Sequence, residues 1–458
     1  MTKHSISMQK VTSLAKRRGF IYPGSEIYGG LANTYDYGPV GAELLRNIRS
    51  LWWEVFVQRR DDIVGLEASL ISHQEIWKAS GHTTGFADAQ VDCRNCKLRM
   101  RADHLIEDSL DGKNVEGLTT DELDNIISEN KIKCPNCGKS DWTKVRKFNL
   151  LFPVNLGIIE GDQSLAYLRG ETAQGMFVNF KNVIESTRVK LPFGIAQLGK
   201  SFRNEITPGN SVFRTLEFEQ GEIEYFFDPN ESNWEELFEE WKKSIWSFIT
   251  EKIGIDKDNL RWREHGEKER SFYSKKTEDL EYNFPFGFKE LWGLAYRTDY
   301  DLSQHEKGSG KELKISSPQT NEKKLPHVIE PAVGINRIFL MVLCDAYREE
   351  ANRVYLKINP KIAPFKAAVF PLLANKPELV NKAKEIYKEL RKEIMVTFDD
   401  RGNIGKRYLY QDEIGTPFCV TVDFDTLQDD CVTVRDRDTM KQERIKISEL
   451  KNYLNKNL

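Results

Sequence analysis

Residues 200–220 read KSFRNEITPGNSVFRTLEFEQ, and this stretch indicates a binding hairpin. Alternation places Arg203 and Glu205 on one face of a first strand, and Arg214 and Phe218 on one face of a second. The shared face would suit a nucleotide, because arginine binds phosphate, a carboxylate accepts from an exocyclic amine and an aromatic ring stacks on a base. A salt-bridged hairpin at the protein surface explains this stretch alone equally well.

A second segment supports the nucleotide interpretation. Residues 330–340 read EPAVGINRIFL, and the strand-like run that includes Glu330 leads through Gly334 into a helix with Arg337 in its first turn. Glycine allows a ligand to approach the backbone closely, and a helix N-terminus with an arginine favours phosphate.

The regions around these two segments predict an α+β domain with an antiparallel sheet and flanking helices. Alternating apolar and polar residues predict strands, whereas apolar residues at three- to four-residue spacing predict helices. The predicted strands are 63–71, 148–156, 193–202 and 213–227. The predicted helices are 41–58 and one that opens with a capping box at Ser232–Glu235.

Strands and helices alternate beyond Asn359-Pro360, which predicts a separate α/β domain. Its predicted strands are 365–371, 394–399, 418–424 and 432–436, and its predicted helices are 377–392 and 404–414. We therefore predict three parts. They are a main domain made of 1–87 and 148–360, an insertion at 88–147 and a C-terminal domain at 361–458.

Four cysteines of the insertion form two Cys-x-x-Cys pairs, which predict a structural zinc site. The pairs are Cys93 with Cys96 and Cys134 with Cys137. Four thiolates complete a closed tetrahedral site without an open position for catalysis. The loop between the pairs is longer than the usual span of about 15–20 residues, so reduced thiols without metal are the alternative.

The composition excludes several classes of protein. The chain has 458 residues, with 67 Lys and Arg against 70 Asp and Glu, which excludes a polybasic binder but not a local nucleic-acid patch. No apolar run approaches the roughly 20 residues that span a bilayer. The N-terminus lacks the apolar core of a secretory signal, so we expect a cytoplasmic protein.

Taken together, the segments resemble motifs 1, 2 and 3 of the class II aminoacyl-tRNA synthetases, in that order. Motif 1 would centre on Pro39, motif 2 on 203–218 and motif 3 on Arg337. The resemblance is closest to the dimeric glycyl-tRNA synthetases, and phrases similar to that family run along the chain. They are IYGGL at 27–31, WKASGH at 77–82, RAD at 101–103, ETAQG at 171–175, SFRNEITP at 201–208, ELWG at 290–293 and QDEIGTP at 411–417.

The resemblance implies an enzyme that activates glycine with ATP and Mg²⁺ and transfers it to the 3′ end of tRNA(Gly). It implies a homodimer that meets along the motif 1 helix, and a C-terminal mixed-sheet domain that binds the anticodon. The implied ATP-site residues are Arg203, Asn204, Glu205, Phe213, Arg214, Phe218, Glu290, Leu291, Gly334 and Arg337. The implied glycine-site residues are Arg101, Glu171, Phe218, Gln220, Glu222, Glu330, Ala332 and Gly334.

Within the implied ATP site, Arg203, Arg337 and Glu290 form the catalytic set. The resemblance assigns the α-phosphate to Arg203, the γ-phosphate to Arg214 and Arg337, and the adenine amine to Glu205. Phe218 would stack on the adenine. It assigns Mg²⁺ and ATP placement to Glu290. The underlying chemistry is positioning and neutralisation of phosphate charge, and it needs no nucleophilic side chain.

The implied glycine site places two carboxylates, Glu171 and Glu222, on the glycine ammonium. A charged floor offers no apolar reward to a larger side chain, which favours glycine. The chain departs from the family at two positions. Gly170 stands where proline is usual, and Ala332 stands where serine is usual, so we expect an altered affinity for glycine.

Two other functions stay open at the sequence level. A class II synthetase for another small amino acid is one, although Glu171 and Glu222 argue against it. A non-catalytic RNA-binding subunit is the other, although such proteins tend to lose the motif arginines. The predicted tRNA contacts, each of which could equally be solvated surface, are Arg401, Lys406, Arg407, Arg435 and Arg437. Isolated histidines that we expect in the core or on the surface are His73, His82, His305 and His327, with His82 also a candidate to line the site.

Overall fold

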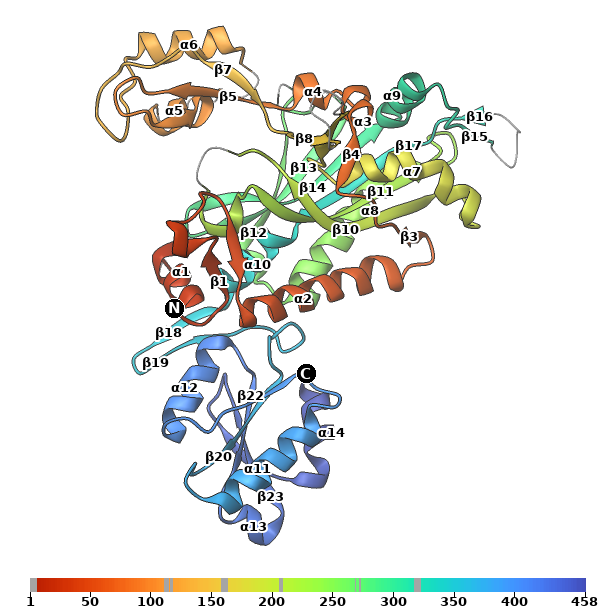
Figure 1. The fold of residues 1–458 in the computed structure, drawn as a ribbon. Helices are drawn as coiled ribbons and strands as arrows, with labels where there is room; N and C mark the ends of the chain where they lie inside the picture. The colour runs from red at the N-terminus through yellow and green to blue at the C-terminus, as the bar shows by residue number, and fades with distance from the viewer. Residues whose placement is uncertain are drawn as a thin grey trace.

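The computed structural model describes residues 6–110, 115, 118–157, 164–205, 209–267, 269–271, 273–316 and 323–458. A seven-stranded sheet in the order β12-β13-β14-β17-β11-β10-β3 forms its centre (Figure 1). The strands are β3 (Ile63–Gly65), β10 (Phe193–Phe202), β11 (Glu217–Phe227), β12 (Leu260–Glu264), β13 (Lys276–Phe284), β14 (Gly287–Thr298) and β17 (His327–Gly334). Neighbours pair antiparallel except β10 with β3, so the predicted antiparallel sheet is confirmed.

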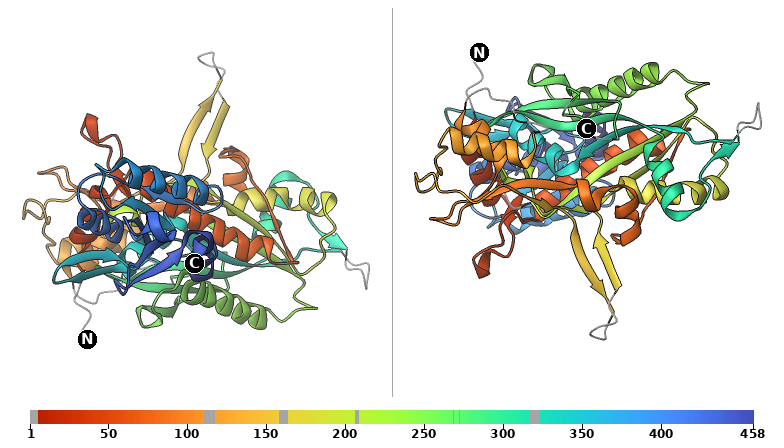
Figure 2. Two further views of the ribbon diagram at one scale, coloured as in Figure 1. Left: turned by 90° about the horizontal axis from the view of Figure 1, so that it is seen from below. Right: turned by 90° about the horizontal axis from the view of Figure 1, so that it is seen from above.

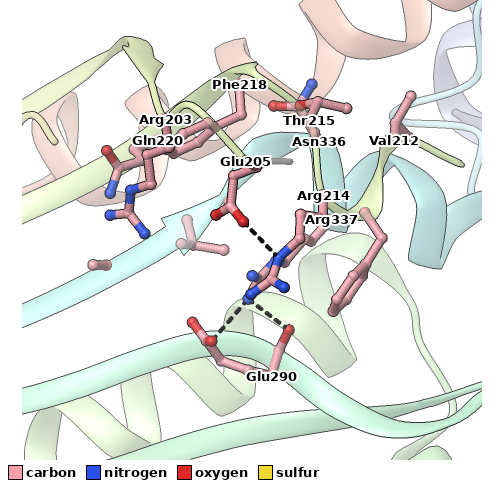
Figure 3. Close-up of a pocket in the computed structure, with 14 residues that line it drawn as sticks. Arg203, Glu205, Val212, Arg214, Thr215, Phe218, Gln220, Glu290, Asn336 and Arg337 are labelled. Carbon is pink, nitrogen blue, oxygen red and sulfur yellow. Dashed lines mark hydrogen bonds and ion pairs between the residues drawn. The ribbon is translucent and has the colours of Figure 1, made fainter. Parts of the chain in front are cut away.

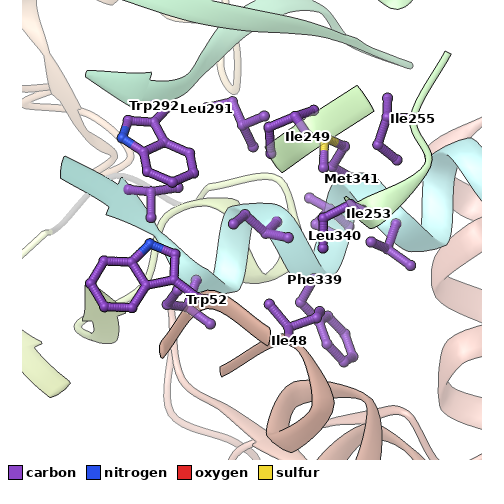
Figure 4. Close-up of a cluster of buried hydrophobic side chains, with 14 of the residues drawn as sticks. Ile48, Trp52, Ile249, Ile253, Ile255, Leu291, Trp292, Phe339, Leu340 and Met341 are labelled. Atoms are coloured by element: carbon purple, nitrogen blue, oxygen red, sulfur yellow. The ribbon is translucent and has the colours of Figure 1, made fainter. Parts of the chain in front are cut away.

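Five helices flank this sheet and the surrounding loops. They are α2 (Pro39–Trp53), which continues as a π-helical turn at Glu54–Gln58, α7 (Ala173–Ser186), α8 (Trp234–Ser247), which continues as a π-helical turn at Phe248–Ile253, α9 (Tyr300–Ser309) and α10 (Ile335–Ala346). Figure 4 shows Trp52 of α2, Trp292 of β14 and Phe339 of α10 in the main core. A Cβ at Gly221 would lie 2.8 Å from the Trp52 ring, so only glycine lets α2 pack this closely on β11.

Strand β11 has one face for the core and one face for the site, because successive side chains of a strand point to opposite faces. Tyr225 and Phe227 lie in the main core with α2, α8 and α10. Phe226 lies in a second core with α7 on the other face. Glu222 and Glu224 share the face of Phe226, so the sheet directs its carboxylates away from the main core.

Smaller elements surround the sheet. The N-terminal ones are α1 (Met8–Arg17), β1 (Ile21–Pro23), the 3-10 helix η1 (Glu26–Tyr28) and β2 (Tyr35–Tyr37). A three-stranded sheet contains β4 (Ile71–His73), β8 (Phe152–Leu156) and β9 (Ser164–Leu168), and α3 (Gln74–Ala79) and α4 (His82–Gly85) follow β4. The remaining short elements are η3 (Ser211–Phe213), η5 (Lys257–Asn259), β15 (Ile315–Ser316), β16 (Lys323–Lys324), β18 (Tyr347–Glu350) and β19 (Arg353–Leu356).

The cysteine-bearing insertion projects from the sheet domain at the opposite end from the C-terminal domain (Figures 1 and 2). Its elements are β5 (Ala87–Asp92), β6 (Arg99–Arg101), α5 (Ala102–Ser109), α6 (Thr120–Glu129) and β7 (Arg146–Asn149). It has a hydrophobic cluster of its own, which includes Val91, Leu105, Leu123 and Val145.

The C-terminal domain has a mixed five-stranded sheet, as predicted. Its elements are β20 (Ala367–Pro371), α11 (Pro377–Leu390), β21 (Val396–Phe398), α12 (Ile404–Ile414), β22 (Phe418–Val422), α13 (Thr426–Asp429), β23 (Cys431–Asp436), β24 (Gln442–Lys446) and α14 (Ile447–Asn457). Strand β20 is parallel to β21 and β22, whereas β23 is antiparallel to β22 and β24. The sequence prediction did not include β24, α13 or α14.

Several local predictions were wrong. The predicted strand 63–71 is two short strands, β3 and β4, and the predicted strand 148–156 is divided between β7 and β8. Strand β10 ends at Phe202 and β11 begins at Glu217, so Arg203, Glu205 and Arg214 lie on the connection and not on strand faces. Asn233, rather than Ser232, caps α8.

Two further predictions concern the phrase SFRNEITP and membrane-spanning segments. Residues 206–208 of the family-like phrase SFRNEITP lie outside the described residues. Among the described residues, no helix combines the length and apolar character that crossing a bilayer needs.

Candidate active site

A pocket opens where the β10–β11 connection meets the end of β17 and the start of α10 (Figure 3). We call it the nucleotide pocket. Its lining residues are Arg203, Glu205, Val212, Phe213, Arg214, Thr215, Phe218, Gln220, Glu290, Ala332, Val333, Gly334, Asn336 and Arg337. The two segments that first indicated a nucleotide therefore line one pocket, although they are more than 100 residues apart in the chain.

Arg203 is held by two aromatic rings and one carbonyl group. Its guanidinium carbon lies 5.0 Å from the centre of the Phe86 ring and 5.2 Å from that of Phe218. Its Nε donates to the carbonyl oxygen of Gly170 at 3.0 Å. Among the described residues its Nη atoms have no hydrogen-bond partner, so they can bind a phosphate.

Two further arginines form ion pairs that leave them partly exposed. Arg214 Nε lies 3.2 Å from a carboxylate oxygen of Glu205. Arg337 Nη1 lies 2.9 Å from a carboxylate oxygen of Glu290 and donates to the Glu290 carbonyl at 3.0 Å (Figure 3). The Glu290 side chain is 49% exposed, so it is accessible from solvent.

A buried group of charges lies on the same face of the sheet as Gln220. We call it the carboxylate network. It consists of Glu171, Glu222, Glu224, Asp301 and Glu330 with Arg297. Carboxylate oxygens of Glu222, Glu224 and Glu330 lie within 4.8 Å of one another.

Arg297 is the cation of this network, and its side chain is 1% exposed. It lies 2.7 Å from Asp301 and 2.7 Å from Glu330. Burial raises the pKa of Glu330 to about 8. The negative charges of Glu222 and Glu171 contribute to this increase, and the positive charge of Arg297 offsets only part of it. Burial and then Glu171 likewise raise the pKa of Glu222.

The structure places the predicted site residues in three groups. The nucleotide pocket contains ten of them, which are Arg203, Glu205, Phe213, Arg214, Phe218, Gln220, Glu290, Ala332, Gly334 and Arg337. The carboxylate network contains three, which are Glu171, Glu222 and Glu330. The third group lies outside both and contains Arg101, Asn204 and Leu291.

Arg101 was expected in the glycine site, and that role stays a prediction. Its guanidinium lies 3.0 Å from Asp88 and 2.5 Å from Asp103, and its charge acts on Glu205 and Arg214. Asp88 and Asp103 therefore hold Arg101 near the nucleotide pocket, although it is not one of the lining residues.

Two predicted ATP-site residues do not line the nucleotide pocket with their side chains. The side chain of Leu291 is fully buried in the main core, since β14 directs it away from the pocket. The main-chain N–H of Asn204 donates to the carbonyl of Leu150 at 2.8 Å. A contact of Leu291 with ATP would therefore use its main chain.

Sequence reasoning missed three members of the site. Glu224 follows Gln220 and Glu222 at two-residue spacing, so the same alternation could have identified it. Arg297 and Phe86 have no comparable signal, because each reaches the site from an element distant in sequence.

Four cysteine sulfurs of the insertion converge. Cys93 Sγ lies 3.6 Å from Cys137 Sγ, and Cys96 Sγ lies 3.6 Å from Cys134 Sγ. The two pairs form the same turn, in which the first cysteine exchanges main-chain hydrogen bonds with the residues four and five positions later. The residues that follow the second cysteines, Lys97 and Gly138, both have positive φ.

Most of the predicted tRNA contacts in the C-terminal domain are buried, so they are neither surface nor available to tRNA. Arg407 and Arg437 are each 2% exposed and donate to main-chain carbonyl groups. Arg435 donates twice to Asp412, at 2.8 and 2.9 Å. The two predicted contacts that remain exposed are Arg401 and Lys406.

Comparison with known proteins gives three family matches. Residues 158–347 match the tRNA synthetase class II core domain (G, H, P, S and T). Residues 113–150 match the glycyl-tRNA synthetase insertion domain 1, and residues 366–457 match the anticodon binding domain.

Relatives match along nearly the whole chain. The chain is 52% identical to the glycine–tRNA ligase of Clostridium perfringens, over 99% of this chain and 98% of that protein. It is 51% identical to the glycine–tRNA ligase of Bacillus anthracis, over 99% of both. The chain therefore belongs to the glycine–tRNA ligases, a family of class II aminoacyl-tRNA synthetases.

Proposed function

We propose that this protein activates glycine with ATP to glycyl-adenylate and transfers the glycine to the 3′ end of tRNA(Gly). One observation carries the proposal. A pocket with three arginines adjoins a buried group of carboxylates along one face of β11. Cations for a triphosphate and anions for an ammonium group are the charges that the two substrates need.

In the nucleotide pocket, Arg203 would bind the α-phosphate and stabilise the charge that develops there. Its fixed plane between two rings supports this role, because preorganised cations need no reorganisation during the reaction. Arg214 and Arg337 would hold the γ-phosphate, and Glu205 the adenine amine. Arg214 and Arg337 each already form an ion pair with a carboxylate, so a bound phosphate would replace that carboxylate as a partner in part.

Glu290 fits the expected role at Mg²⁺, because Mg²⁺ takes oxygen ligands and this carboxylate is half exposed at the edge of the pocket. Mg²⁺ bound with ATP supplies charge neutralisation at the phosphates. The ion pair with Arg337 holds the carboxylate of Glu290 in position.

In the carboxylate network, Glu171 and Glu222 would receive the glycine ammonium. Glu171 accepts from Gln174 at 3.0 Å and Glu222 accepts from the hydroxyl of Thr172, so neighbours fix both carboxylates. A pocket floor made of fixed charges favours the smallest amino acid, since it offers no apolar contact to a larger one.

ATP–pyrophosphate exchange with a panel of amino acids tests the proposal. We expect exchange with glycine and little with alanine or serine. Strong exchange with serine or alanine but not with glycine would instead support the alternative of a synthetase for another small amino acid.

The four cysteines would hold a structural zinc ion. Tetrahedral zinc with thiolate bonds of about 2.3 Å requires sulfurs about 3.8 Å apart, close to the observed 3.6 Å. We expect stoichiometric zinc in the purified protein and its loss in Cys93→Ser. Cys431→Ser is the control, because Cys431 lies in the C-terminal domain. Unchanged zinc in Cys93→Ser would refute the site.

The C-terminal domain would bind the anticodon of tRNA(Gly). Deleting it is a poor test, because Ile414 lies in the main core and Asp412 accepts from Arg353 of β19. Reversing the exposed charges with Arg401→Glu and Lys406→Glu is cleaner. We expect weaker tRNA charging with unchanged pyrophosphate exchange, and equal charging would contradict these contacts.

A homodimer that meets along α2 is the remaining expectation. The inward residues of α2, among them Ile48 and Trp52, are used by the main core of the chain itself. Leu51 and Trp53 are only partly buried and could meet a second copy. Sedimentation would show a dimer that Trp53→Glu weakens, whereas a monomeric wild type would refute it. The cytoplasmic location stays a prediction.

A further inference from the structure

His82 lies at the start of α4 beside the carboxylate network, and its side chain is fixed on every side. Its Nε2 lies 3.3 Å from a carboxylate oxygen of Glu171, and its Nδ1 lies 2.8 Å from the hydroxyl of Ser80. The ring centre lies 5.2 Å from that of Trp77 and 5.0 Å from that of Phe86. Only 4% of the residue is exposed.

We propose that His82 is a positioning residue for the amino-acid substrate, which holds the Glu171 carboxylate in one orientation. This inference rests on the proposed role of Glu171 at the glycine ammonium. His82 itself acts through Glu171 and needs no contact with glycine.

The two oxygens of Glu171 have separate partners. One accepts from Gln174 Nε2 at 3.0 Å, and the other faces His82 Nε2. The hydrogen bond between the Ser80 hydroxyl and Nδ1 fixes the plane of the ring, so that Nε2 faces the carboxylate. The Ser80–His82 pair therefore sets the orientation in which Nε2 meets Glu171.

Electrostatics gives the same role to His82. Burial alone works to raise the pKa of Glu171, yet His82 and then Arg297 outweigh it and hold that pKa well below its ordinary value. Glu171 differs in this from Glu222 and Glu330, whose pKa values are raised. Among these three carboxylates, Glu171 is thus the one whose surroundings favour the ionised form.

His82 also lies near the nucleotide pocket, so a test must separate the two substrates. Phe86 packs on the His82 ring and contacts the Arg203 guanidinium. Replacement by phenylalanine keeps a ring between Trp77 and Phe86 but removes both nitrogens. Replacement by glutamine restores an N–H donor near the position of Nε2.

The experiment measures pyrophosphate exchange with glycine varied at saturating ATP, and then with ATP varied at saturating glycine. For His82→Phe we expect the KM for glycine to rise about tenfold to a hundredfold, as for a lost hydrogen bond to a charged group. The KM for ATP should stay close to wild type. His82→Gln should recover most of the affinity for glycine, and His73→Asn, which keeps the cap of α3, is the matched control.

The proposal is overturned if His82→Phe leaves the KM for glycine unchanged, or if the KM values for both substrates rise together. If His82→Phe fails to fold, Ser80→Ala decides, with a raised KM for glycine expected and an unchanged one contradicting the proposal. Failure of the proposed function looks different, because the wild type itself would then show no exchange with glycine.

Discussion

The two halves of the active site use charge in opposite ways. In the nucleotide pocket, Arg214 and Arg337 keep about a quarter of their side chains exposed, and each has one carboxylate partner. In the carboxylate network, Arg297 is fully enclosed and serves Asp301 and Glu330 together. The first half is open and positive, whereas the second is closed and negative.

This difference predicts what a substitution in each half will do. A partly exposed cation is available to bind a ligand, so its removal should lower activity and change stability little. In the closed network, the cation already binds the carboxylates of the network itself. Removing that cation therefore leaves buried charges without a partner. Stability and function are therefore separable in the nucleotide pocket and coupled in the carboxylate network.

Replacing Arg297 should have the largest effect on stability. Arg297→Met leaves Asp301 and Glu330 buried without their cation, and breaking a buried pair in this way costs about 3–5 kcal/mol. Urea denaturation measures the loss. Arg188→Met is the control, because Arg188 is exposed. A loss no larger than that of the control would remove the distinction between the two halves.

Arg203→Ala should show the opposite behaviour. Removing a preorganised group from the developing charge costs about a hundredfold to a thousandfold in rate. Stability should fall by less than in Arg297→Met, since the side chain contributes one hydrogen bond and two ring contacts, each worth about 0.5–1.5 kcal/mol. Pyrophosphate exchange and urea denaturation on one preparation give both values. A large loss of stability with normal exchange would contradict the open character of the pocket.

The sequence predicted elements whose signals are local. Helix α12 runs from Ile404 to Ile414 as predicted, since Asn403 caps its start and Gly415, with φ of 79°, ends it. Strand β10 also has its predicted bounds, Phe193–Phe202. Local alternation, however, placed Arg203 on a strand, whereas a loop brings it to the pocket.

Contacts between distant segments could not be predicted in this way. Arg435 looks like a surface residue in sequence, yet Asp412 holds it in the domain interior. Arg297 and His82 likewise gain their roles only when other elements pack on them. Charge and spacing identify a residue that can bind a phosphate, but only the packed structure shows whether it is still free to do so.

Glu224→Gln should change how stability depends on pH. Burial and then Glu330 raise the pKa of Glu224 well above its ordinary value, so the folded protein keeps a proton that the unfolded chain releases above about pH 4.5. Stability therefore falls as pH rises through this range, by as much as about 1.4 kcal/mol per pH unit, and glutamine has no such proton to lose.

Thermal unfolding between about pH 5 and 9 measures this difference. The slope should be shallower in Glu224→Gln than in the wild type. Glu217→Gln is the control on the same strand, because Glu217 is half exposed and lies outside the network. Parallel slopes in wild type and Glu224→Gln would show that the closed half does not hold this proton.

The smallest expected effect lies at the boundary of the two halves. Ala332 lines the nucleotide pocket and stands opposite Glu222 of β11. A hydroxyl in Ala332→Ser would add one hydrogen bond close to the substrate, worth about 0.5–1.5 kcal/mol, so the KM for glycine should fall about twofold to tenfold. Ala332→Cys has a similar size but a weak donor, so it should leave the KM for glycine near wild type. Equal effects of serine and cysteine would mean that packing, and not a polar contact, sets glycine affinity at this position.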